Sequence, residues 1–239
     1  MEIRTKRTMI IESIESQSGT LMLQKRITPD GERFELIVGG HYVMSAVDGQ
    51  TERMLATRTL ADVDSPGPLT VCVGGLGLGL TLRQTLYDGR VNEVVVAEIE
   101  EAIVRWNRLY LSCFNDHALF DHRVTVYTGD VMEVIRRDKR RFDAILLDVD
   151  NGPSFLVLEK NDRLYGRSGL KSMRRALKPG GVLGLWSYRP DRRFHRLLDD
   201  VFDSVHVTLI EDNLHDRDLP STAIYTAKSS SRGRRVCMR

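Results

Sequence analysis

The sequence predicts an α/β protein with a mainly parallel, seven-stranded sheet, helices on both faces of that sheet, and a small antiparallel β region at the N-terminus. After residue 68, short apolar segments alternate with amphipathic segments, which is typical of a buried parallel sheet. Before residue 50, short segments rich in β-formers are separated by turn residues. The 239 residues, 41% of them hydrophobic and 28% charged, are enough for one large core.

The chain divides into four expected parts. Residues 1–50 form the N-terminal β-strand region, and residues 51–68 form a helix and a linker that is rich in proline and glycine. Residues 69–227 form the main domain. Residues 228–239 contain five basic residues and no acid, so we expect a flexible basic tail there.

Each expected element follows from hydrophobic periodicity and from the turn residues at its ends. In the N-terminal part, strands are expected at Thr20–Arg26, Phe34–Val38 and His41–Ala46, followed by a helix at Thr51–Ala61. In the main domain, strands are expected at Leu69–Val73, Val91–Ala97, Val124–Tyr127, Phe142–Leu147, Val182–Trp186, Val205–Ile210 and Ala223–Ala227. Helices are expected at Thr81–Tyr87, Glu101–Leu111, Val131–Arg137, Leu170–Leu177 and Phe194–Val201, with Lys178 to Gly181 closing the fourth.

Charge and cysteine content exclude several classes of protein. The net charge of +2 gives no general attraction to nucleic acid, and the basic run after residue 135 is expected to be a solvated helix end. The three cysteines have no metal-ligand spacing, so we expect neither a metal site nor a disulfide framework. With no signal peptide and no apolar run long enough for a bilayer, we expect a cytoplasmic protein without a membrane partner.

A glycine-rich loop follows the first strand of the main domain. Gly75, Gly77 and Gly79 have the spacing G-x-G-x-G, and a helix follows them. Glycine lets the backbone approach a ligand closely, and the helix start offers free N–H groups. The spacing differs from that of dinucleotide-binding loops, and no lysine follows for a triphosphate. The loop alone is equally compatible with a plain strand-turn-helix.

Acidic residues follow the next two strands. Glu98 ends its strand about twenty residues beyond the loop, where an acid can accept hydrogen bonds from both hydroxyls of a ribose. Asp130 follows the third strand, where it can contact an adenine amino group, cap the helix that starts at Val131, or do both. Together with the loop, these positions predict a nucleoside site.

Two further acids follow the fourth strand, at Asp148 and Asp150. Carboxylates at this edge of a sheet are suited to a general base or to an anchor for an amine or sulfonium. We favour such a function for Asp148. For Asp150 and the adjacent Asn151, a simple turn remains an equal alternative.

The order of these signals resembles the spermidine synthase, or polyamine aminopropyltransferase, family within the class I methyltransferase fold that binds S-adenosylmethionine (SAM). The similar stretches are VCVGGLGLGLTLR, VVVAEIEEAIVRWNR, VTVYTGDV, FDAILLDVDNGP and LKPGGVLGLWS, and the resemblance runs from about residue 10 to residue 227. It implies SAM or decarboxylated SAM as co-substrate, a small-molecule acceptor such as an amine, and a homodimer.

The resemblance also implies roles for matching positions. Gly75, Gly77, Leu78 and Gly79 match the nucleoside-binding loop, Glu98 the ribose ligand, Ile99 the residue beside the adenine, and Asp130 with Val131 the adenine-amino contact. Asp148 matches the catalytic aspartate. The segments Asp148–Pro153 and Asn161–Tyr165, with Asp150, Asn151 and Tyr165, match the acceptor site, and Glu52 adds a further acid beside it.

Two departures from the family pattern bear on the transferred group. Leu78 stands where the family has a loop aspartate that binds the donor's aminopropyl ammonium, and Thr51 stands near a family tyrosine. Losing the loop acid removes much of the preference for a cationic arm. The sequence therefore places methyl transfer from SAM first, aminopropyl transfer second, and a nucleoside-binding protein with little catalysis third.

Overall fold

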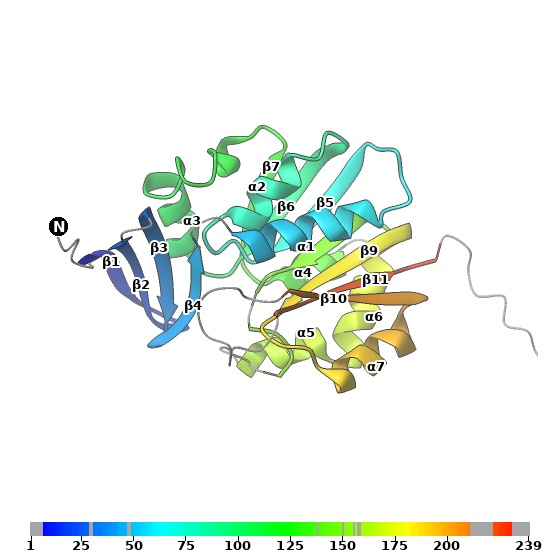
Figure 1. The fold of residues 1–239 in the computed structure, drawn as a ribbon. Coiled ribbons are helices and arrows are strands. Elements are labelled where there is room, and N and C mark those ends of the chain that lie inside the picture. Colours follow the sequence, from blue (N-terminus) through cyan, green and yellow to red (C-terminus); the bar gives the residue numbers. More distant parts are fainter. Residues whose placement is uncertain are drawn as a thin grey trace, which may run out of the picture.

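The structure is a computed structural model with two sheets, one of four strands and one of seven, and with helices packed on the larger sheet (Figure 1). It describes residues 7–28, 31–46, 49–137, 139–149, 151–154, 156, 159–210 and 222–230. The predicted α/β class is confirmed.

The N-terminal sheet is antiparallel, with its strands in sequential order. Its members are β1 (Arg7–Ser16), β2 (Gly19–Thr28), β3 (Gly31–Val38) and β4 (His41–Ala46). The strand β1 was missed, because its adjacent apolar residues Met9 and Ile10 are both exposed and break the two-residue alternation. On β3, Leu36 and Val38 point to one side and join the core of the main domain.

The larger sheet has the order β10-β11-β9-β8-β5-β6-β7. The strands β5 to β9 are parallel, and β10 and β11 add an antiparallel edge. Their bounds are β5 Leu69–Gly74, β6 Val91–Glu98, β7 Val124–Thr128, β8 Phe142–Leu147, β9 Leu177–Ser187, β10 Ser204–Ile210 and β11 Thr222–Lys228. All seven strands confirm the predicted ones.

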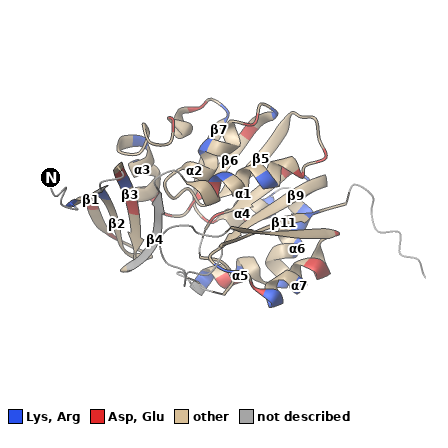
Figure 2. Cartoon of the chain, viewed as in Figure 1, with Lys and Arg blue, Asp and Glu red and all other residues tan. Residues whose placement is uncertain are grey.

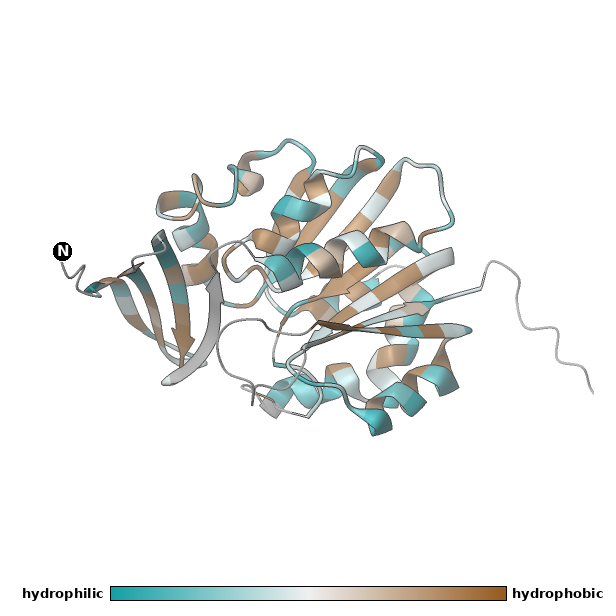
Figure 3. Cartoon of the chain, in the orientation of Figure 1, coloured by the Kyte–Doolittle hydropathy of each residue, from teal (hydrophilic) through white to brown (hydrophobic). Residues whose placement is uncertain are grey.

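Helices cover both faces of this sheet, and the strands that they cover are the most hydrophobic part of the main domain (Figure 3). One face carries α1 (Gln50–Ala61), α2 (Leu80–Leu86) and α3 (Glu101–Leu109). The other carries α4 (Val131–Arg137), α5 (Asp162–Tyr165), α6 (Arg167–Ala176) and α7 (Arg192–Val201). Two 3₁₀ turns, η1 (Ala118–Phe120) and η2 (Glu159–Asn161), lie in connections. None of the described helices is long and apolar enough to cross a bilayer.

Basic residues occur on several helices, including α6 and α7 (Figure 2). Arg136 and Arg137 end α4, and both are exposed, as is Arg140 beyond the helix. The basic run after residue 135 is thus a solvated helix end, as the sequence predicts.

The segment Lys178 to Gly181 was expected to close a helix, but in the structure it belongs to β9. Its backbone pairs with the chain just after β11: the Gly180 N–H donates to the Ser229 carbonyl at 2.8 Å, and the Ser229 N–H donates to the Gly181 carbonyl at 2.9 Å. The predicted tail therefore starts inside the sheet. Lys228 ends β11, and its Nζ lies 2.6 Å from Asp64 Oδ1.

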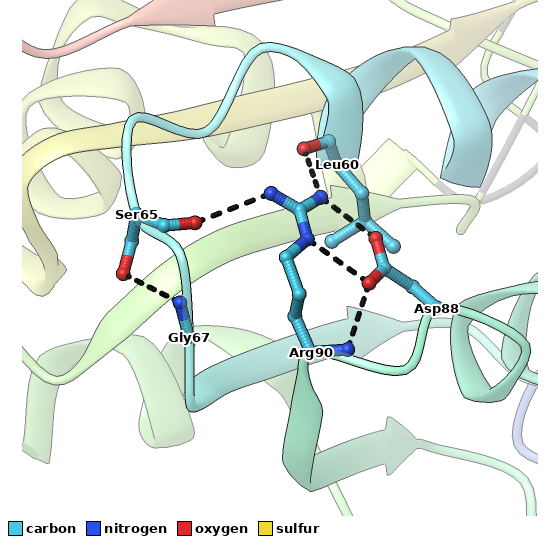
Figure 4. A network of polar contacts seen from close by, with 5 residues as sticks. All are labelled: Leu60, Ser65, Gly67, Asp88 and Arg90. Atoms are coloured by element: carbon cyan, nitrogen blue, oxygen red, sulfur yellow. Dashed lines mark hydrogen bonds and ion pairs between the residues drawn. The ribbon is translucent and has the colours of Figure 1, made fainter.

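An arginine fastens the end of the sheet that lies opposite the carboxyl ends of the parallel strands (Figure 4). The Arg90 guanidinium donates to the Leu60 carbonyl at 2.8 Å, to the Ser65 carbonyl at 3.2 Å and to Asp88 Oδ2 at 2.7 Å. The hydrogen bond that Asp88 accepts from Arg90 also lowers the pKa of Asp88. This network joins the end of α1, the linker before β5 and the turn before β6.

Candidate active site

A cavity lies at the carboxyl ends of the central strands, where the strand order reverses between β5 and β8. It encloses about 1030 Å³, including space open to solvent, which suits a nucleoside with a small second ligand. The main domain and α1 contribute Glu52, Gly75, Gly77, Ala97, Glu98, Ile99, Glu100, Ile103, Gly129, Asp130, Val131, Asp148, Val149, Asn151, Asn161, Leu164 and Trp186. The N-terminal sheet contributes Ser18, Leu36 and Val38.

The structure brings most of the predicted site residues together. The predicted residues in the lining are Glu52, Gly75, Gly77, Glu98, Ile99, Asp130, Val131, Asp148 and Asn151. Three predicted site residues do not occur among the described lining residues of the cavity: Leu78, Gly79 and Tyr165. A fourth, Asp150, is not among the residues that the structure describes.

The glycine loop passes close to the end of β8. Gly75 has a φ of 85°, and a Cβ there would overlap the Asp148 carbonyl, so only glycine fits. The Leu78 side chain is fully buried in the apolar core instead of facing the cavity. Gly79 has a φ of 84° and caps the start of α2. Leu78 and Gly79 therefore support the loop from the side that faces away from the cavity.

Glu98 holds the loop from the side of β6. Its Oε2 accepts from the Leu76 N–H at 2.8 Å, and its Oε1 accepts from the Glu100 N–H at 2.9 Å. Burial raises the pKa of Glu98, and these two N–H groups oppose the rise. Because a carboxylate has about four acceptor positions, Glu98 keeps capacity for a further hydrogen-bond donor from the cavity.

Asp130 is held at the start of α4. Its Oδ1 accepts from the Met132 N–H at 2.9 Å, and its Oδ2 is ion-paired with Arg163. The capping interpretation is confirmed. The contact with an adenine amino group remains a prediction, and it has to share the carboxylate with these two partners.

Asp148 follows β8 at the base of the cavity, and Thr81 Oγ1 of α2 donates to its Oδ2 at 2.7 Å. Burial raises the pKa of Asp148 from 3.8 to about 7, the negative charge of Glu52 adds to the rise, and the Thr81 bond opposes it. A carboxylate with a pKa near 7 is an effective general base at neutral pH.

Glu52 comes from the buried face of α1. It shares that face with Leu55, Ala56 and Thr59, three, four and seven positions further on, and it is 7% exposed. Thr51 Oγ1 donates to its Oε2 at 2.8 Å. The structure thus places a second carboxylate beside the candidate base.

Tyr165 lies in the core and is not among the described lining residues of the cavity. Its ring packs in the core on the α7 face of the sheet, with its centroid 5.7 Å from that of Phe194. Adjacent residues on a helix point about 100° apart. The preceding residue, Leu164, and Asn161 line the cavity instead.

Sequence reasoning missed the wall that the N-terminal sheet provides. Leu36 and Val38 face the cavity, and the Ser18 hydroxyl donates to the carboxylate of Glu100. The two-residue spacing of Leu36 and Val38 was the available signal. Trp186, near the end of β9, both lines the cavity and packs against the core.

The charge of the cavity is one-sided. Five carboxyl groups line it, and no Lys, Arg or His is among its described lining residues; the acids are Glu52, Glu98, Glu100, Asp130 and Asp148. No group of three or more potential metal ligands occurs among the described residues. The five carboxyl groups therefore make the cavity attractive to positively charged groups.

A cavity at the switch point, a glycine loop after β5 and an acid at the end of β6 are features of the Rossmann-like α/β class. The particular family follows from a comparison of sequences. Residues 36–191 match the family described as spermine/spermidine synthase domain, and the chain belongs to this family.

Named relatives agree with this assignment. The chain is 33% identical to a spermidine synthase of Dictyostelium discoideum over 49% of this chain and 39% of the relative. It is 28% identical to polyamine aminopropyltransferase 2 of Pseudomonas aeruginosa over 58% of this chain and 41% of the relative. These alignments span about two fifths of the length of the curated relatives.

Solved structures share the fold. A crystal structure titled as spermidine synthase in complex with the transition state analogue AdoDATO has a TM-score of 0.77 and 22% identity, over 93% of this chain and 74% of that one. Spermidine synthase from Thermotoga maritima has a TM-score of 0.76, with the same identity and coverage. The relatives' names, spermidine synthase and polyamine aminopropyltransferase, match the activity that the sequence placed second, aminopropyl transfer, and not methyl transfer, which it placed first.

Proposed function

We propose that this chain transfers a 3-aminopropyl group from decarboxylated SAM to an amine acceptor. The supporting observation is the acidic cavity with no basic side chain among its described lining residues. Decarboxylated SAM carries a sulfonium and an ammonium, which these acids attract. SAM carries an additional carboxylate, which they repel. The names of the relatives, spermidine synthase and polyamine aminopropyltransferase, point to the same chemistry.

The residues of the cavity suit this donor. Glu98 would accept from the ribose hydroxyls, Ile99 would pack beside the adenine, and Asp130 would contact its amino group. Gly75 and Gly77 would allow the backbone to approach the nucleoside. Glu52 offers the carboxylate that Leu78 lacks, so it would bind an ammonium group of a substrate from the side of α1.

Asp148 would act as the general base. An amine acceptor enters largely as an ammonium ion, and Asp148 would accept one proton from it. The freed lone pair then forms a C–N bond to the propyl carbon attached to sulfur, and the C–S bond breaks. The sulfur keeps the bonding pair, and methylthioadenosine leaves. Positioning supplies much of the rate, because the sulfonium is already a good electrophile.

The test is calorimetric titration with decarboxylated SAM, SAM and methylthioadenosine, followed by product analysis with putrescine and spermidine. We expect tighter binding of decarboxylated SAM than of SAM, and a longer polyamine together with methylthioadenosine. Asp148→Asn should bind the donor but form no product. Tighter binding of SAM than of decarboxylated SAM, together with a methylated product, would contradict the proposal. Methyl transfer, the activity that Leu78 suggested in the sequence, would then be the function.

A further inference from the structure

Two buried asparagines lie directly behind the glycine loop. Asn107 is on α3, and Asn115 is in the turn after α3; each is 1% exposed. Neither lines the cavity. Buried amides are costly unless their polar groups are used, so these two side chains call for a role.

Both asparagines donate to loop carbonyls. Asn107 Nδ2 donates to the Gly77 carbonyl at 2.8 Å, and Asn115 Nδ2 donates to the Leu78 carbonyl at 3.2 Å. Asn115 Nδ2 also donates to Asn107 Oδ1 at 2.7 Å, which joins the two amides. The Asn115 Oδ1 is buried without a partner among the described residues, so this side chain acts only as a donor.

The surrounding contacts leave the loop little freedom. A Cβ at Gly79 would overlap both asparagine side chains, so the amides pack tightly against the loop. Arg83 on α2 donates to the Phe114 carbonyl at 3.0 Å and holds the turn that carries Asn115. On the opposite side, Glu98 holds the Leu76 N–H.

We infer that Asn107 and Asn115 are positioning residues that fix the peptide orientations of the glycine loop before a nucleoside binds. Their bonds keep the Gly77 and Leu78 carbonyls turned away from the cavity. Pre-organisation of this kind raises affinity because less conformational entropy is lost on binding. The inference concerns how the nucleoside is held, so it does not depend on which group is transferred.

The test uses methylthioadenosine as the probe and the variants Asn107→Ala and Asn115→Ala. We expect its Kd to rise about tenfold in each, as for the loss of about 1.4 kcal/mol. The KM for the acceptor should stay unchanged. Arg90→Gln is the control, since it removes partly buried hydrogen bonds at the opposite end of the sheet and should lower Tm without changing this Kd.

A measurement on the unmodified chain keeps the inference testable if a variant does not fold. The NMR order parameters of the Gly77, Leu78 and Gly79 amides, recorded without ligand, should match those of α2, at about 0.85. Values below about 0.6 would overturn the inference. A Kd that stays unchanged in both asparagine variants while Tm falls would also overturn it, because that is the signature of a purely structural role.

Discussion

The substitution Glu52→Gln should shift the pH dependence of turnover, because the charge of Glu52 helps to set the pKa of Asp148. The rise of that pKa from 3.8 to about 7 corresponds to about 4 kcal/mol of additional free energy for ionising Asp148 in the folded chain. Burial is the larger cause and Glu52 the smaller. Removing the charge of Glu52 should therefore lower the pKa of Asp148, while burial keeps it above the ordinary value of 3.8.

The assay is the initial rate of methylthioadenosine release between about pH 5 and pH 9. In the unmodified chain, the acid limb of kcat/KM should have its midpoint near the pKa of Asp148, about 7. Glu52→Gln should move this midpoint to lower pH, because a neutral amide no longer opposes the second negative charge. The position of the midpoint is independent of the absolute rate, so a weaker variant remains informative.

Two variants complete the experiment. Thr81→Val removes the hydrogen bond that favours ionised Asp148, so its midpoint should move to higher pH. Glu100→Gln removes a different carboxylate of the cavity, on the side of Glu98, and should leave the midpoint in place. An acid limb that stays unmoved in Glu52→Gln, or that moves upward, would refute the coupling between the two carboxylates.

Three further variants test the fold and the site. Because its pKa is raised, Asp148 keeps its proton in the folded chain at pH values where the unfolded chain has released it. The free energy of unfolding should therefore fall by up to about 4 kcal/mol as pH rises from about 4 to 7. Asp148→Asn should abolish turnover and remove this fall, as measured by urea unfolding at about pH 5 and about pH 8. Leu78→Asp, which restores the family's loop acid, should lower the free energy of unfolding by several kcal/mol without tightening donor binding, since this side chain is fully buried; tighter binding of decarboxylated SAM would contradict that. Arg90→Gln should lower the free energy of unfolding by about 2 kcal/mol, and an unchanged Tm would show that its bonds contribute nothing net.

The periodicity of the sequence was sufficient for the main domain. The strands β8 and β6 contain the continuous apolar runs Ala144–Leu147 and Val94–Ala97, and such runs have few stable environments other than the middle of a covered parallel sheet. Because the carboxyl ends of parallel strands meet at one edge, the sequence alone assigns Gly75, Glu98 and Asp148 to one site.

Local patterns were insufficient where pairing with a distant segment decides the structure. The segment Lys178 to Gly181 has the composition of a helix end, yet it belongs to β9, because its backbone forms hydrogen bonds with that of Ser229. Likewise, β1 could not be predicted, because it carries exposed apolar side chains on an edge of the small sheet.

The sequence by itself determined the fold class, the glycine loop and the acids at the strand ends, because these features are encoded in neighbouring residues. Only the tertiary structure decided which side chains face the cavity. It buried Leu78, brought Glu52 of α1 close to Asp148 after β8, and placed Leu36 of the N-terminal sheet in the lining of the same cavity. The balance of charges in a site depends on such long-range packing, and so does the pKa of its candidate base.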